Sequence, residues 1–126
     1  LTMLSQLHNQ PLREFQEALE QMYYQVGADD VARSAIQEQF QALKGLFISQ
    51  IASISVEDIP LDYVSRWQSL KTEIYKQIRL LENDLMLLQA SRSPETAKFR
   101  QKGVCDRIGT LINYCQGWLQ QSQEQP

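Results

Sequence analysis

The sequence has few of the residues from which common catalytic and metal sites are built. It contains one histidine, His8, and two cysteines, Cys105 and Cys115. One histidine cannot form a histidine cluster for a metal, and in this N-terminal segment it is a poor candidate for a general base. The motifs Cys-x-x-Cys, His-Glu-x-x-His and Glu-x-x-His are absent, and the five glycines are scattered rather than gathered into a phosphate-binding loop. We therefore predict a protein that is not an enzyme and that binds neither a metal nor a cofactor.

The two cysteines are also badly spaced for a disulfide with each other. They lie ten residues apart in a helical pattern, which places their Cα atoms about 15 Å apart, beyond the reach of a disulfide bond. Reduced, buried cysteines and the lack of a secretory signal pattern in the first residues favour a cytoplasmic location. The longest apolar run has four residues, at 85–88, so we expect no membrane insertion.

Charge is distributed unevenly along the chain. Residues 1–62 carry nine acidic and three basic residues, a net charge of −6, and the remainder carries +3. Two interpretations fit this asymmetry: acidic and basic helices that face each other or stay solvated, or a basic surface on the later helices that faces a partner. Nucleic acid is a poor candidate for that partner, because the net charge of the chain is −3 and no basic-aromatic recognition motif occurs.

Apolar residues recur every three or four positions in the first half of the chain, the pattern of two amphipathic helices. The first is expected to begin with Asn9 as N-cap and Pro11 in its first turn, and to end at Gly27 as a C′ glycine. Asp29 or Asp30 is expected to cap the second, which would reach about residue 53, with Gly45 marking a close helix approach or a slight bend. The apolar stripes are Leu12, Phe15, Leu19, Met22 and Val26 in the first helix, and Ile36, Phe40, Leu43, Phe47, Ile51 and Ile54 in the second.

Two longer helices are predicted in the second half. The clearest break in the periodicity, at 55–60, ends with Pro60, which suits the start of a helix that runs to about residue 90. Ser93 and Pro94 then have the pattern of an N-cap and a first helical position. The apolar stripes are Val64, Trp67, Ile74, Ile78, Leu81, Leu85 and Leu88 in the third helix, and Val104, Cys105, Ile108, Leu111, Ile112, Cys115 and Leu119 in the fourth.

The fold class predicted from these stripes is all-α. Short connections make neighbouring helices antiparallel, so we expect an elongated up-down antiparallel four-helix bundle with long third and fourth helices, whose hairpin tip projects beyond a shorter first helix. The bundle would form a single domain at 9–120, preceded by an N-terminal extension at 1–8 and followed by a disordered polar tail at 121–126.

The end of the third helix is apolar on more than one face, which suggests a candidate contact surface. Leu81, Leu85 and Leu88 satisfy the core stripe, whereas Leu80 and Leu87 form a second face. A helix of this kind is either packed on two sides or offers a surface to a partner, and the sequence leaves both open. Glu82 and Asp84 are expected to be solvated charges without a joint role. The residues predicted to contribute to a protein-interaction surface are Arg79, Leu80, Leu87, Arg92 and Arg100.

Three segments of the second half resemble a known family. They read SRWQSLKTEIYKQIRLL at 65–81, DLMLLQASR at 84–92 and DRIGTLINYC at 106–115, and they resemble the cyanobacterial heterocyst frequency control protein PatD family. The resemblance implies a small regulator that limits how many cells of a filament differentiate into heterocysts, with a link to the division protein FtsZ as partner. The alternative function, from the residues alone, is a homo-oligomeric structural or assembly scaffold, for which a homodimer is the simplest form.

Overall fold

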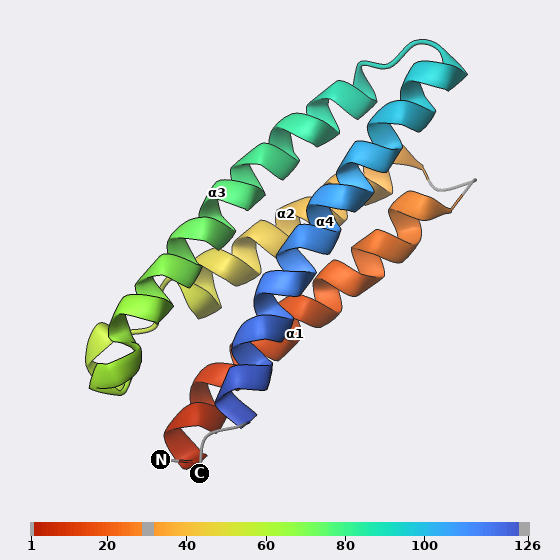
Figure 1. Cartoon of the computed structure of the whole chain (residues 1–126). Coiled ribbons are helices and arrows are strands. Elements are labelled where there is room, and N and C mark those ends of the chain that lie inside the picture. Colours follow the sequence, from red (N-terminus) through yellow and green to blue (C-terminus); the bar gives the residue numbers. More distant parts are fainter. Residues whose placement is uncertain (1, 29–31, 124–126) are drawn as a thin grey trace.

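The computed structural model describes residues 2–28 and 32–123, and it places side chains within 9–28 and 32–121. This part of the chain is all-α, as predicted, and its long helices run alternately up and down (Figure 1). The four α-helices are α1 (Thr2–Gly27), α2 (Arg33–Leu46), α3 (Val64–Gln89) and α4 (Pro94–Gln123).

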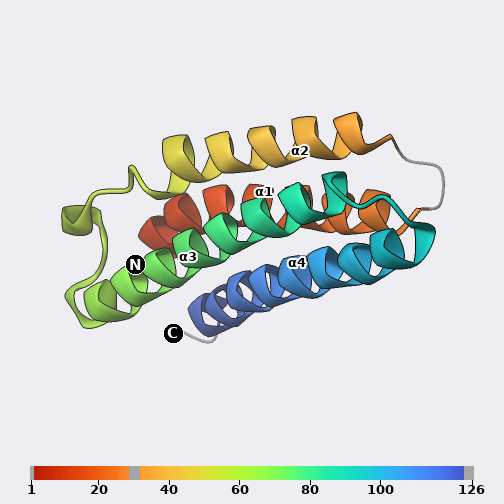
Figure 2. The same ribbon diagram turned by 90° about the horizontal axis from the view of Figure 1, so that it is seen from above.

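The helices form an antiparallel bundle in which α4 makes the most extensive contacts. It packs lengthwise against both α1 and α3, whereas α2 lies mainly on α1 and contacts α3 at fewer positions (Figure 2). The predicted apolar stripes line the interior, where Leu12, Phe40, Trp67 and Leu111 have no exposed surface. Burial of these stripes is the main stabilising contribution to helices of this length.

The first helix begins earlier than predicted. The structure places residues 2–8, expected to be an extension, in the same helix as the rest of α1, so Asn9 is not an N-cap and Pro11 lies inside the helix. An interior proline removes one backbone hydrogen bond and costs about 3 kcal/mol, which the buried face of α1 offsets through tertiary packing. With 26 residues, α1 is as long as α3, so the prediction of a shorter first helix is wrong. Gly27 does end the helix, but without the positive φ of a C′ glycine.

The second helix is shorter and less regular than its periodicity indicates. Its N-cap is Ala32, which makes no side-chain capping bond; Asp29 and Asp30, the predicted caps, lie outside the described residues. After Leu46 the chain continues as a π-helix, Phe47–Ile51, whose wider turn keeps both of these end residues buried. Gly45 marks no close approach, because a Cβ at this position would meet no atom within 4 Å.

Two short 3₁₀ turns precede α3; the first lies in the predicted break, and the second replaces the predicted start of the third helix. They span Val56–Asp58 and Leu61–Tyr63, and Ser55 accepts a hydrogen bond of 3.3 Å from the backbone N–H of Glu57. Ser and Asp favour such local bonds over a regular helix, which explains the break. Consequently α3 begins at Val64 rather than directly after Pro60.

The predicted start of α4 is confirmed. The Oγ of Ser93 accepts a hydrogen bond of 3.1 Å from the backbone N–H of Thr96, and Pro94 is the first helical residue. At its other end α4 continues past residue 120 to Gln123, so residues 121–123 of the predicted tail are helical; residues 124–126 lie outside the described residues. None of the helices in the described part of the chain is long and apolar enough to span a membrane.

Candidate protein-interaction site

The second apolar face predicted on α3 lies at the border between core and solvent. Leu81, Leu85 and Leu88 are buried, whereas Leu80 and Leu87 keep 36% and 37% of their surface exposed. Leu80 and Leu87 are seven residues apart and therefore project within about 20° of each other around the helix. The same side of α3 carries Asp84, which bonds to α4. Leu80 and Leu87 thus form an apolar edge beside α4, neither fully packed nor fully free.

Leu87 and Arg100, two of the predicted contact residues, meet in a shallow groove between α3 and α4. We call this site the hairpin groove; its volume is about 170 Å³. Its lining residues are Asp84, Leu87, Phe99, Arg100, Lys102, Gly103 and Asp106. The groove lies close to the turn that joins the two helices, where α4 has made only a few turns.

Phe99 is the residue of the hairpin groove that sequence reasoning missed. It lies off the buried stripe of α4, and 71% of its surface is exposed. The guanidinium carbon of Arg100 lies 5.7 Å from the centroid of its ring, within cation–π range. The available signal was an aromatic residue between two cations, Lys98 and Arg100, at a position that the helical periodicity leaves in solvent.

The other predicted contact residues are not brought into the groove. Arg79 is exposed and stacks near Tyr75, with its guanidinium carbon 5.9 Å from the ring centroid. Arg79 lines a separate cavity of about 250 Å³ between α3 and the π-helix that follows α2, together with Phe47 and Ile48. Arg92 is exposed in the connection before α4. The five predicted residues therefore do not form one continuous site.

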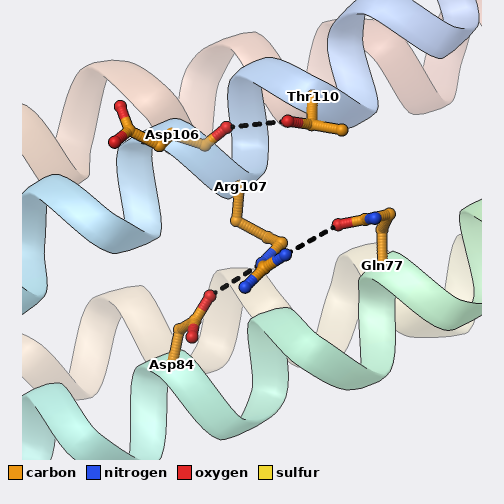
Figure 3. Close-up of polar contacts among 5 residues, drawn as sticks. All are labelled: Gln77, Asp84, Asp106, Arg107 and Thr110. Carbon is orange, nitrogen blue, oxygen red and sulfur yellow. Dashed lines mark hydrogen bonds and ion pairs between the residues drawn. The ribbon is translucent and has the colours of Figure 1, made fainter.

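A polar cluster, centred on Arg107 of α4, lies next to the hairpin groove. Its Nε donates to Asp84 Oδ2 at 2.9 Å, and its Nη1 donates to Gln77 Oε1 at 3.1 Å (Figure 3). The side chains of Arg107 and Asp84 are only 31% and 19% exposed, and Gln77 is buried. These contacts fix the rotation and register of α4 against α3 beside Leu80 and Leu87.

The prediction that Glu82 and Asp84 are merely solvated charges is therefore wrong. Asp84 accepts from Arg107 across the α3–α4 interface, and Glu82 accepts from Lys44 Nζ at 3.2 Å across the α2–α3 interface. Each carboxylate thus contacts a different neighbouring helix. Some of the charged residues behind the uneven charge distribution therefore form ion pairs between helices of the bundle.

Basic residues around the groove remain without acidic partners. In the described part of the chain, Arg92, Lys98 and Arg100 form no ion pair, whereas Lys102 pairs with Asp106 at 3.5 Å. Both side chains of this last pair are more than two-thirds exposed, so it contributes little to stability. The first turns of α4 therefore present positive charge beside an exposed aromatic ring.

No protein-family model, curated protein sequence or solved structure matches the chain. The assignment of the hairpin groove therefore depends on its own geometry and chemistry.

The cysteines are the only thiols available for nucleophilic or redox chemistry. Burial raises the pKa of Cys115 to about 12, and burial together with the neighbouring Asp106 raises the pKa of Cys105. A raised pKa leaves both groups as neutral thiols at physiological pH, and the thiolate is the reactive form. Within 2–28 and 32–123, no three His, Cys, Asp or Glu residues are grouped so that they could hold a metal ion.

These thiols give a direct measure of burial in the folded chain. At about pH 8 we expect a thiol reagent to modify Cys105 slowly and Cys115 only after unfolding, because less thiolate forms at a raised pKa and Cys115 is inaccessible. Labelling of each thiol is followed by mass spectrometry of peptides. Labelling in concentrated urea provides the control for full reactivity, and rapid modification of Cys115 in buffer would contradict its burial.

Proposed function

We propose that this chain is a non-enzymatic regulatory protein-interaction module whose contact surface is the α3–α4 hairpin. The observation that carries the proposal is the hairpin groove, where exposed Phe99 and half-exposed Leu87 lie beside Arg100. Aromatic residues and arginine are enriched in protein interfaces, and apolar surface rimmed by polar residues marks contact sites. The Arg107 cluster supports the proposal because it holds both walls of the groove in place.

The resemblance to the PatD family points to the class of partner. The resembling segments, at 65–81, 84–92 and 106–115, fall on α3, the turn and α4, and they contain the apolar edge formed by Leu80 and Leu87. By that resemblance, the module acts in the cytoplasm on heterocyst frequency, and its partner is the division protein FtsZ. We adopt this as the proposed function.

The proposal is tested by direct binding to purified FtsZ. The double variant Leu80→Glu/Leu87→Glu places two charges on the apolar edge, and we expect at least about tenfold weaker binding, equivalent to about 1.4 kcal/mol. Binding is measured by fluorescence anisotropy of the labelled chain, and circular dichroism establishes that the variant is folded. An unlabelled wild-type chain serves as competitor.

A matched control introduces the same two leucine- or isoleucine-to-glutamate changes at exposed positions outside the hairpin groove. Ile48 and Leu61 are exposed apolar residues outside the hairpin groove, so Ile48→Glu/Leu61→Glu introduces the same charges elsewhere. We expect this variant to bind as the wild type does. If the two double variants bind FtsZ equally well while folded, the hairpin is not the contact surface; if the wild type fails to bind, FtsZ is not the partner.

A further inference from the structure

We propose that the hairpin groove binds an acidic peptide segment that carries one large apolar side chain. This inference rests on the proposed function, because it names the chemistry of the partner at the same surface. It follows from the groove's size, from the charges around it and from the adjacency of its aromatic ring and its cation.

The size of the groove suits a peptide side chain. Small-molecule and cofactor sites commonly enclose about 300–1,000 Å³. The hairpin groove offers about 170 Å³ and is open to solvent. Gly103 leaves the floor of the groove uncovered, since a Cβ at this position would meet no atom within 4 Å. An apolar side chain of a partner can therefore lie between Leu87 and Phe99.

The charges around the groove favour a negatively charged partner. Arg100, which lines the groove, forms no ion pair among the described residues, and neither do Lys98 and Arg92, which precede it by two and eight residues. The two carboxylates in the lining are already engaged, Asp84 by Arg107 at 2.9 Å and Asp106 by Lys102 at 3.5 Å. An incoming carboxylate thus meets an unpaired guanidinium in the groove, a complementarity that increases both the association rate and the specificity.

The ring of Phe99 and the guanidinium of Arg100 are close enough to bind one short segment together. Their separation of 5.7 Å places the apolar contact and the ion pair within one or two residues of a peptide. Arginine is well suited to this role, because its planar group can stack on the ring and still donate hydrogen bonds to a carboxylate.

The chemistry of the preferred ligand can be read from a random peptide library displayed on phage and selected against the whole chain. We expect the enriched peptides to be net acidic and to contain Leu, Phe or Trp. The most enriched peptide is then synthesised with a fluorescent label, and its affinity is measured by anisotropy. Enrichment of neutral or basic peptides, or no enrichment at all, would overturn the proposal.

Variants of the groove then locate the binding site. Phe99→Ala and Arg100→Glu are each expected to weaken binding of the selected peptide at least about tenfold. Gly103→Leu is expected to have the same effect by filling the groove, although it replaces an exposed helical glycine with a residue of higher helix propensity and should therefore stabilise α4. A loss of binding in this variant therefore cannot be attributed to unfolding.

Two control variants match these changes at distant positions. Tyr24→Ala truncates an exposed aromatic residue of α1, and Arg66→Glu reverses an arginine that lies 5.6 Å from the ring centroid of Tyr63. Both should bind the peptide within about twofold of the wild type. Unchanged binding in Gly103→Leu and Arg100→Glu would overturn the proposal. It would also be overturned if the wild-type chain forms a dimer that Arg100→Glu dissociates, because the groove would then bind a second copy of the chain. Either result leaves the FtsZ measurement to decide the proposed function separately.

Discussion

Replacing Trp67 with alanine is expected to lower the free energy of unfolding by about 3–5 kcal/mol, the largest effect of any substitution considered for this chain. The side chain of Trp67 is fully buried in α3. Its ring centroid lies 5.3 Å from that of Trp118 in α4, and Trp118 in turn contacts Tyr63 at 6.1 Å in an edge-on geometry. The truncation would leave a cavity at the end of the bundle where the α2–α3 connection meets α4.

Trp67→Phe separates the loss of packing from the loss of the indole. The Nε1–H of Trp67 is buried and has no hydrogen-bond acceptor within the described part of the chain. Phenylalanine keeps most of the aromatic contact and removes this unpaired donor, so the cost should fall to about 1–2 kcal/mol. Native proteins have unfolding free energies of only about 5–15 kcal/mol, so the alanine variant is expected to be close to unfolding.

The measurement is urea denaturation followed by circular dichroism. Phe99→Ala is the matched control, because it also removes an aromatic ring, but one that is largely exposed, and we expect a change below about 0.5 kcal/mol. A Trp67→Ala variant within about 1 kcal/mol of the wild type would show that the aromatic contacts with α4 are not central to the core.

The sequence allowed the helices to be predicted because burial is periodic. Every fully buried position in α3, such as Ile74 and Leu81, falls on the stripe expected from spacings of three and four. The ends of the helices were harder to predict than their buried faces, since the ends depend on tertiary packing. Pro11 has the local signature of a first helical turn, yet α1 begins nine residues earlier, at Thr2. The π-helix at Phe47–Ile51 likewise has no distinct local pattern.

The candidate site was predictable only in part, for a related reason. Leu87 and Arg100 could be chosen because each departs from the expected polarity or charge of its own helix. Their proximity to each other, and to Phe99, depends on the rotation and register of α4 against α3. The ion pair between Arg107 and Asp84 was not predicted for the same reason. A charged residue near the border of an apolar stripe is expected to be solvated unless the position of the neighbouring helix is known.

Replacing Arg107 with leucine is expected to lower the free energy of unfolding by about 2–3 kcal/mol. The change leaves Asp84 with a carboxylate that is 19% exposed and Gln77 with a buried amide, and each loses the donor it has in the native structure. Part of the cost is therefore the desolvation of partners that remain unpaired. Urea denaturation gives the value for Arg107→Leu, for Asp84→Leu and for the double variant.

The double variant separates the interaction energy of Arg107 and Asp84 from the cost of leaving one of them buried without its partner. Removing both partners restores an apolar contact, so we expect the double variant to be more stable than the sum of the single effects predicts, with a coupling energy of about 1–2 kcal/mol. The exposed pair of Lys102 and Asp106 is the matched control, and its coupling should lie near zero, within about 0.5 kcal/mol. Equal coupling in the two pairs would mean that Arg107 does not act as a partly buried link.

The same variants connect the stability of the hairpin to its proposed contact surface. Asp84 lies one helical turn from Leu87, and Arg107 lies one turn from Gly103, so the cluster holds the two walls of the hairpin groove at a fixed separation. Arg107→Leu should therefore weaken binding of an acidic peptide even under conditions where the variant is fully folded. The double variant should recover part of the stability but not the affinity, because it lacks the polar bonds that set the register of α3 against α4.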